Sequence, residues 1–201
     1  MIIAIDSGSR EYTLAVALDA AGQVLKESFL SDVLGLAPWL QTAQEEGLME
    51  ALVVASGPGS YTGVRTGLAL VQGVRAVLPL PLFTSSSLRI AWETGRDAAP
   101  SIATRKAGRS RWFAAPVDAG GVVGPCILVE ESDLRSSSAR LVGEHESTWR
   151  DRHVAGLAGV AAACVAHHEP VSGSPEVDYG PTLVQPLATI GDVFSLSGLR
   201  P

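Results

Sequence analysis

The stretch SGPGSYTGVRTG, residues 56–67, decides how the fold of this chain is interpreted. It follows the apolar run ALVVAS (51–56) and leads into LALVQGVRAVL (68–78), in which apolar residues recur at steps of three and four. This order predicts a buried strand, a glycine-rich turn and an amphipathic helix over about residues 61–77. Turns that open helices in this way often bind phosphate, because their backbone N–H groups point outwards together.

The glycine-rich turn matches neither of the common phosphate-binding patterns. A Walker A loop needs a lysine followed by serine or threonine, and residues 56–67 contain no lysine. The dinucleotide fingerprint GxGxxG is also missed, because Gly57, Gly59 and Gly63 are spaced GxGxxxG. Gly63 and Gly67 share one face of the expected helix, which favours close approach of another helix or of the protein's own sheet.

Strands and helices alternate through the first half of the chain. MIIAID (1–6), TLAVALD (13–19) and GQVLKESFL (22–30) are expected as three consecutive strands of a meander. Helices are expected over 33–45 and, with a serine cap and a terminal glycine, over 86–95. A short strand, PLFTSS, precedes the second of these. The order implies an α/β fold with a parallel or mixed sheet and right-handed crossovers.

The second half is less regular. SIATRK (101–106) and SRWFAAPV (110–117) are expected as strands, and the latter pairs with VVGPCILVE across DAGG. A hairpin is preferred here to a phosphate turn, because Gly–Gly readily takes the positive φ of tight turns. Residues 131–153 are expected to be rich in loops, and a helix is expected over 154–168.

A composition change near GRDAAPS suggests where the chain divides. It predicts an N-terminal lobe over residues 1–98 and a smaller, divergent C-terminal lobe over 99–201.

Composition excludes several classes of protein. The chain has 201 residues and a net charge of −6, which argues against a broad nucleic-acid-binding surface. Its two cysteines, Cys126 and Cys164, are too few for a disulfide framework or a zinc site, and favour a reducing, cytoplasmic setting. No apolar run reaches the roughly 18 to 20 residues that a membrane-spanning helix needs. The N-terminus lacks the basic segment of a secretory signal.

Motifs for catalysis and metal binding are missing from the sequence. The histidines, at positions 145, 153, 167 and 168, form neither HxxxH nor HExxH. No GxSxG elbow occurs, and neither cysteine has a local histidine or aspartate signature. We therefore expect no catalytic residue and no metal in this chain.

Three segments together carry a specific resemblance. MIIAIDSGS, VVASGPGSYTGVRTGLALVQGV and PLFTSSSL match in order and spacing the pattern AIDTS…GPGSFTGLRIG…GLA…GVSSL. By this pattern, which covers about residues 1–90, the chain resembles the TsaB (YeaZ) family. The resemblance implies an actin-like fold (ASKHA, ribonuclease H-like) with two lobes, in which mixed sheets are flanked by helices.

The resemblance also implies a function. TsaB-type proteins are non-catalytic scaffold or activator subunits that form a heterodimer with the transferase TsaD. The complex, which the ATPase TsaE joins, makes N6-threonylcarbamoyladenosine at position 37 of tRNAs that read codons starting with A. TsaD carries an HxxxH metal site that this chain lacks. The resemblance thus implies contact with tRNA only through the complex, no membrane, and a homodimer when the partner is absent.

TsaB-type proteins pair with TsaD through the helix that follows the GPGS turn. The resemblance therefore implies a partner interface on the corresponding helix of this chain. Tyr61 and Arg65 are the expected anchors, because aromatic residues and arginine concentrate binding energy in interfaces. The expected interface residues are Gly57, Pro58, Gly59, Tyr61, Thr62, Gly63, Val64, Arg65, Gly67, Leu68 and Val71.

Two alternatives involve a nucleotide. SGS after the first strand resembles the first phosphate turn of actin-like ATPases and sugar kinases, so Asp6, Ser7 and Ser9 would contact ADP or ATP at the interface with the partner. The rival from the enzyme class is a stand-alone ATP-dependent phosphotransferase or peptidase-like enzyme. In that enzyme Asp6 and Asp118 would hold Mg²⁺.

The chain departs from the family pattern at three places. Asp32 stands near a position where the family often has His-Ser or His-Thr. In TRKAGRSRWF, Thr104 replaces the aspartate of the family's DAR if Lys106 takes the arginine's place, and Arg109 or Ser110 stands where an acid is expected. Near the C-terminus, Leu183 and Gln185 replace the tyrosine and arginine of Pro-x-Tyr-x-Arg. The departures fall mainly in the second lobe.

Overall fold

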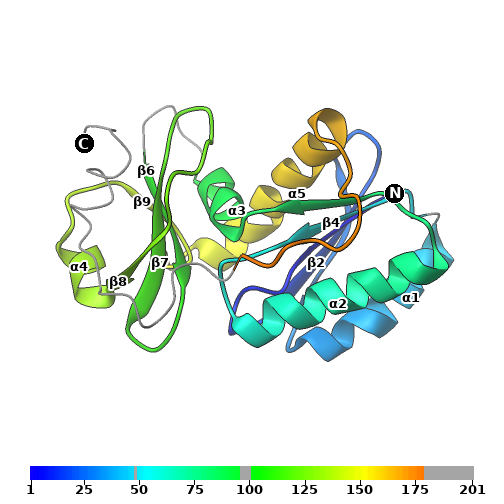
Figure 1. Cartoon of the computed structure of the whole chain (residues 1–201), viewed down its shortest axis with the longest axis horizontal. Coiled ribbons are helices and arrows are strands. Elements are labelled where there is room, and N and C mark those ends of the chain that lie inside the picture. Colours follow the sequence, from blue (N-terminus) through cyan, green and yellow to red (C-terminus); the bar gives the residue numbers. More distant parts are fainter. Residues whose placement is uncertain (48, 96–100, 179–201) are drawn as a thin grey trace.

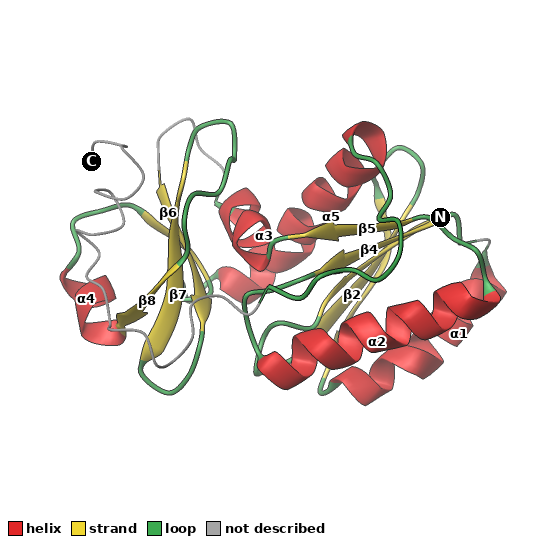
Figure 2. Cartoon of the chain, in the orientation of Figure 1, coloured by secondary structure: helices red, strands yellow, loops and turns green. Residues whose placement is uncertain are grey.

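The computed structural model describes residues 1–47, 49–95 and 101–178. Two β-sheets lie side by side, and helices cover both faces of the larger sheet (Figures 1 and 2). The larger sheet has the strand order β3-β2-β1-β4-β5 and the smaller one β8-β7-β6-β9. Both sheets are mixed, because each combines antiparallel and parallel pairs.

The first sheet is built from the meander and two crossover strands expected from the sequence. Its strands are β1 (Ile2–Asp6), β2 (Thr13–Leu18), β3 (Val24–Leu30), β4 (Ala51–Ala55) and β5 (Leu82–Ser85). β1 pairs antiparallel with β2 and parallel with β4, so it occupies the centre. Every residue of β1, β2 and β4 is buried, as expected for strands covered on both faces.

Alternate residues of the central strand serve two separate cores. Ile3 and Ile5 pack with helices α1 (Leu36–Glu46) and α2 (Tyr61–Val77), whereas Ile2 and Ala4 pack with α3 (Ser87–Thr94) and α5 (Trp149–His167). This follows from the two-residue period of a strand. A 3-10 turn over Val33–Gly35 precedes α1, and the Asp32 side chain accepts hydrogen bonds from the N–H groups of Leu34 and Gly35.

The helix predicted over residues 61–77 is confirmed as α2, with the same bounds. Ser60 begins it, because its hydroxyl accepts a hydrogen bond from the N–H of Gly63 at 3.3 Å. Gly57 precedes it with φ of +105°, a conformation that favours glycine.

The second sheet contains β6 (Ser101–Lys106), β7 (Arg111–Val117), β8 (Ile127–Glu130) and β9 (Leu141–Gly143). The predicted hairpin across DAGG is confirmed. The Asp118 carboxylate accepts hydrogen bonds from the N–H groups of Gly120 and Val122, and Gly121 has φ of +80°. Helix α4 (Glu131–Ser136) and strand β9 lie in the segment expected to be loops. Both are short, so neither leaves a periodic pattern in the sequence.

The chain returns to its first sheet after completing the second. Helix α5 begins at Trp149, five positions before the expected start, and packs against α3, β1, β2 and β5. The division expected at residue 98 falls between the two sheets, but α5 belongs by its packing to the first. Within the described ranges, no helix is long and apolar enough to cross a membrane.

Candidate functional site

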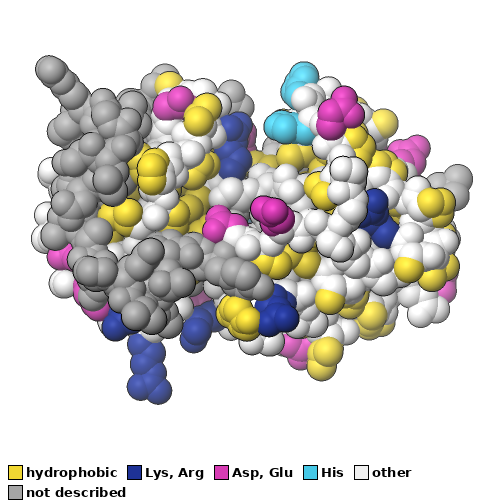
Figure 3. Space-filling view, viewed as in Figure 1, with side chains coloured by type: hydrophobic (Ala, Val, Ile, Leu, Met, Phe, Trp, Pro, Cys, Tyr) yellow, Lys and Arg dark blue, Asp and Glu magenta, His cyan; other side chains and the backbone are white. Residues whose placement is uncertain are grey.

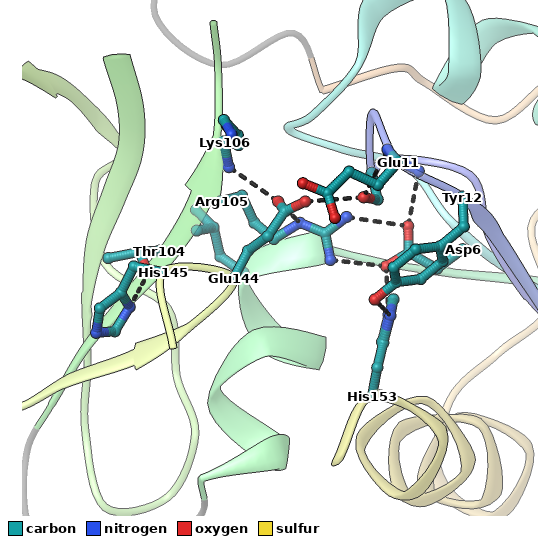
Figure 4. Close-up of polar contacts among 12 residues, drawn as sticks. Asp6, Glu11, Tyr12, Thr104, Arg105, Lys106, Glu144, His145 and His153 are labelled. Atoms are coloured by element: carbon teal, nitrogen blue, oxygen red, sulfur yellow. Dashed lines mark hydrogen bonds and ion pairs between the residues drawn. The ribbon is translucent and has the colours of Figure 1, made fainter. Parts of the chain in front are cut away.

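A buried ion pair joins the two lobes where strand β1 ends. Arg105 of β6 lies with its Nη1 atom 2.9 Å from Oδ2 of Asp6, and both side chains are fully buried (Figure 4). Glu144, just after β9, places Oε2 at 3.4 Å from Nε of Arg105. The guanidinium therefore lies between a carboxylate of the first lobe and one of the second.

His153 of α5 extends the cluster on the Asp6 side. Its Nε2 atom lies 2.9 Å from Oδ2 of Asp6, and its Nδ1 atom lies 3.0 Å from the hydroxyl of Tyr12. An ionised Asp6 can only accept, so Nε2–H donates to it and Nδ1 accepts from Tyr12. Trp149 covers the cluster, with its ring 4.2 Å from that of His153 and 5.0 Å from the guanidinium carbon of Arg105.

Glu144 also accepts a hydrogen bond from one uncharged donor in each lobe. Ser9 donates its hydroxyl to Oε1 at 2.8 Å, and the backbone N–H of Lys106 donates to Oε2 at 2.9 Å. Every carboxylate oxygen of Asp6 and Glu144 thus has a partner within the protein. A buried charge is tolerated when it is paired and hydrogen-bonded in this way.

The electrostatics of the cluster fix its protonation states. Burial by itself would raise the pKa of Asp6, but Arg105 and the hydrogen bonds from His153 and Gly8 outweigh it and hold the pKa well below its usual range. Burial lowers the pKa of His153 despite the neighbouring carboxylate, so the imidazole is neutral. Burial raises the pKa of Tyr12, whose phenol therefore stays protonated. The cluster is an arginine–carboxylate clasp with neutral donors around it.

The turn that follows β1 is occupied by contacts of the clasp. Asp6, Ser7 and Ser9 are all buried, and Ser9 is bonded to Glu144, so the three side chains expected to contact a nucleotide face the interior of the protein in this arrangement. The position where a cation would meet Asp6 is taken by the guanidinium of Arg105. Asp118 bonds its own hairpin instead of facing Asp6. Within the described ranges, no group of three or more His, Cys, Asp or Glu side chains could hold a metal.

The glycines of the SGPGSYTGVRTG stretch approach the protein's own backbone. A Cβ atom at Gly59 would lie 2.6 Å from the carbonyl oxygen of Gly8, and one at Gly63 or Gly67 would overlap atoms of Ser7. Gly63 and Gly67 therefore face Ser7 of their own chain, and their absent side chains let α2 pack on the turn that follows β1. Contact of these two glycines with a partner stays a prediction.

The expected interface residues divide between the inside and the outside of α2. Tyr61, Thr62 and Arg65 are exposed, and Arg65 donates to the Tyr61 hydroxyl at 2.5 Å while its guanidinium carbon lies 5.1 Å from the ring centre. Gly59 and Gly63 are partly covered. The remaining expected residues are buried in this chain and cannot form a partner surface in this state: Gly57, Pro58, Val64, Gly67, Leu68 and Val71. A helix must bury one apolar stripe in its own protein, and here that stripe is the one the sequence analysis assigned to the partner.

The exposed side of α2 borders an apolar groove that the sequence analysis did not identify. The groove has a volume of about 400 Å³ and lies between α1 and α2. Its lining includes Leu40, Leu70, Gly73, Val74 and Val77. Figure 3 shows the surface over α2 as largely uncharged, with hydrophobic side chains scattered along it.

Sequence reasoning singled out Asp6 but missed its clasp partners Arg105, Glu144 and His153, of which Arg105 is the most informative. Lys106 was set in the place of the family's arginine, but the side chain that reaches the first lobe is that of Arg105. The segment SIATRK did show a charged residue within an expected strand, but Lys106 follows Arg105 directly, so the sequence did not say which of the two faces the first lobe. His153 and Glu144 gave no comparable signal. Leu183 and Gln185 lie outside the described residues.

Comparisons with known proteins identify the fold. No protein-family model and no curated protein matches the chain. YeaZ from Pseudomonas aeruginosa matches with a TM-score of 0.62 and 19% identity, over 86% of this chain and 99% of that one. A protein described as similar to peptidase YeaZ from Pseudomonas aeruginosa matches with a TM-score of 0.56 and 18% identity, over 98% of this chain and 89% of that one. The expected fold class is confirmed: the chain has the two-lobed, actin-like α/β fold of these structures.

Proposed function

We propose that the chain is a TsaB (YeaZ)-type scaffold subunit that pairs with the transferase TsaD in forming N6-threonylcarbamoyladenosine at tRNA position 37. The observation that carries the proposal is the turn and helix over residues 56–77, which match the family pattern and leave one helix side exposed beside an apolar groove. The YeaZ-like fold supports it. In this proposal the protein acts in the cytoplasm, TsaE joins the complex, and tRNA is contacted through TsaD.

The partner surface is the outer side of α2 together with the groove. Tyr61 and Arg65 stand at the start of the helix and are already held to each other, so little side-chain freedom is lost on binding. Ala69 and Gly73 follow one and two turns later and are exposed and small. Small side chains allow a partner helix to approach closely, while the groove receives its apolar side chains. Without TsaD, the same surface would pair with a second copy of the chain.

The clasp supports a non-catalytic role. The carboxylate that a nucleotide-using relative would direct at a cation is buried here against Arg105 and His153. Titration calorimetry of the isolated chain with ADP is expected to give no binding heat. Any ADP or ATP bound by the complex would then lie at the interface with TsaD. Saturable binding and turnover by the isolated chain would favour the stand-alone enzyme.

Substitutions on the exposed side of α2 test the partner surface. Gly73→Arg and Ala69→Arg are expected to remove co-purification with tagged TsaD, because a long charged side chain would fill the approach path. A Cβ atom at Gly73 meets nothing within 4 Å, so the isolated variant should fold normally. Gly108→Arg is the matched control, since Gly108 lies in the β6–β7 turn and is equally open. An intact complex with both α2 variants would overturn the proposed surface.

The pathway itself is tested in cells. Expression of the chain in a TsaB-depleted strain is expected to restore the modified adenosine in bulk tRNA, and Gly73→Arg should fail to do so. Absence of the modified nucleoside with the native chain, despite co-purification with TsaD, would separate partner binding from pathway function.

A further inference from the structure

A hydrogen bond between Ser9 and Glu144 joins the second lobe to the turn that follows β1. The Ser9 hydroxyl donates to Oε1 of Glu144 at 2.8 Å, and each of the two side chains is only 7% exposed. Oε2 of the same carboxylate accepts from the backbone N–H of Lys106 in β6 at 2.9 Å and lies beside the guanidinium of Arg105 (Figure 4). The Glu144 carboxylate is thus fixed to the second sheet, and Ser9 is attached to it.

The same turn holds Ser60, the residue that caps α2. The N–H of Ser60 donates at 2.7 Å to the carbonyl oxygen of Gly8, which lies in the peptide group that joins Gly8 to Ser9. Because a peptide group is planar, the position of Ser9 fixes the direction of this carbonyl. Ser60 in turn accepts from the first helical N–H groups, with its hydroxyl from Gly63 at 3.3 Å and with its carbonyl from Val64 at 2.9 Å. The start of α2 is therefore connected to the second lobe by hydrogen bonds and one rigid peptide group.

The other end of the glycine-rich turn is held within the first lobe. The carbonyl oxygen of Gly57 accepts from the N–H of Ser87 in α3 at 2.7 Å. The turn is thus fixed at both ends, and Ser60 is the end from which the helix begins. Tyr61 follows Ser60 directly, and Arg65 is held to the Tyr61 ring and hydroxyl. The direction of both expected anchors therefore depends on where Ser60 lies.

We propose that Glu144 and Ser9 are positioning residues for the partner surface. They hold the first turn of α2 in the direction in which Tyr61 and Arg65 meet TsaD, so the inference rests on the proposed function. A helix start that is already fixed loses less freedom on binding, and loss of the Ser9–Glu144 bond should weaken binding although the surface itself is unchanged. The second lobe, in which the chain departs most from the family pattern, thereby takes part in partner binding without contacting the partner.

Hydrogen exchange of the isolated chain, followed in nitrogen–proton correlation spectra, tests the connection without a partner. Glu144→Ala should speed exchange of the Val64 amide, which closes the first turn of α2, by about fivefold relative to the Val71 amide in the middle of the helix. A general loss of stability would speed both amides alike. Glu130→Ala is the matched control, because Glu130 also lies 3.4 Å from an arginine Nε, that of Arg111, and its loss should leave the ratio of the two rates unchanged.

Titration calorimetry with TsaD tests the effect on binding. The Kd of Ser9→Ala and that of Glu144→Ala should each be about five- to tenfold higher than the Kd of the native chain, which is a modest coupling between two sites. The double variant should bind no more weakly than Glu144→Ala alone, because both changes break the same hydrogen bond. Glu130→Ala should keep the native Kd.

The outcomes separate this inference from the proposed function. If the native chain does not bind TsaD, the proposed function is overturned, and the exchange ratio still decides whether Glu144 holds the start of α2. If the native chain binds, equal Kd values for it and for both variants would overturn the inference alone, as would an exchange ratio that Glu144→Ala leaves unchanged. Circular dichroism shows which variants are folded. Ser9→Ala carries the same tests if Glu144→Ala does not fold, because it breaks the same bond by the loss of one hydroxyl.

Discussion

The turn after β1 is packed from two sides in two different ways. On the α2 side, Gly59 and Gly63 let the helix backbone contact Ser7 and Gly8, and the N–H of Ser60 donates to the carbonyl of Gly8 at 2.7 Å. This glycine side relies on shape. On the other side, Arg105 reaches Asp6 from the second lobe, so this clasp side relies on paired charge.

The difference explains why one side was visible in the sequence and the other was not. Close packing of two backbones requires small residues at a fixed local spacing. Glycines in a helix are noticeable in a sequence because each lowers helix stability by about 1 kcal/mol relative to alanine. Charge contact requires partners that only the fold brings together, here 99 and 147 residues apart. Substitutions on the clasp side and on the glycine side test whether the two kinds of packing contribute differently to the stability of the fold.

The largest expected effect comes from breaking the clasp side. Arg105→Met leaves the buried carboxylates of Asp6 and Glu144 without their cation and is expected to lower the free energy of unfolding by about 3–5 kcal/mol. Urea unfolding followed by circular dichroism measures it. Arg111→Met is the control, because the Arg111–Glu130 pair is half-exposed and worth at most about 1 kcal/mol.

A double-mutant cycle decides whether charge is the cause. Asp6→Asn combined with Arg105→Met removes both members of the pair, so the loss should be clearly smaller than the sum of the two single losses. Strict additivity would mean that Arg105 acts through packing alone, for example against the ring of Trp149.

The glycine side should respond less strongly. Gly63→Ala places a Cβ atom against the carbonyl oxygen of Ser7, which is backbone and cannot rotate away. Overpacking of this kind costs about 1–3 kcal/mol, more than alanine gains in helix propensity. Thermal unfolding of the variant should therefore show a lower Tm. An unchanged or higher Tm would mean that α2 can move away from the turn without loss.

Much of the fold was predictable because its signals are local. The strand–turn–helix over residues 51–77, the opening meander and the DAGG hairpin all follow from apolar period and turn chemistry. The short elements α4 and β9 were missed, since three to six residues carry no measurable period.

The site was only partly predictable, for a physical reason. An amphipathic helix shows that it has an apolar stripe, but the sequence alone does not say whether that stripe meets its own sheet or a partner. Val64, Leu68 and Val71 turned out to meet the chain's own core. Placing Arg105 required knowing which face of β6 meets Asp6, and a shift of one residue exchanges it with Lys106.

Acid should loosen the clasp side and leave the glycine side unaffected. The titratable and charged groups that face His153 are Asp6, Arg105, Tyr12 and Glu144. Because the folded state lowers the pKa of His153, the unfolded chain binds the proton first, and stability is lost as the pH falls below the ordinary value of 6.5. Asp6, whose pKa is held low, adds a further loss below its ordinary 3.8.

Urea midpoints at pH 7.5 and pH 5 measure the first of these losses. His153→Asn should reduce the difference between the two midpoints. Any remaining difference reports other groups, including His145, whose pKa is also lowered. A pH dependence that is the same in the variant and in the native chain would show that His153 does not titrate in the unfolding transition.

The smallest effect is expected on the outer side of α2, and it has the opposite sign. Gly73 lies in the same helix as Gly63, but a Cβ atom there meets nothing within 4 Å. Gly73→Ala is therefore expected to raise the free energy of unfolding by about 0.5–1 kcal/mol, because alanine restricts the unfolded chain and favours the helix. Measured beside Gly63→Ala, the same substitution ten positions along one helix should stabilise at the exposed side and destabilise at the packed side. A loss of stability at Gly73 would mean that the outer side is already packed, and would remove the free surface on which partner binding by this helix depends.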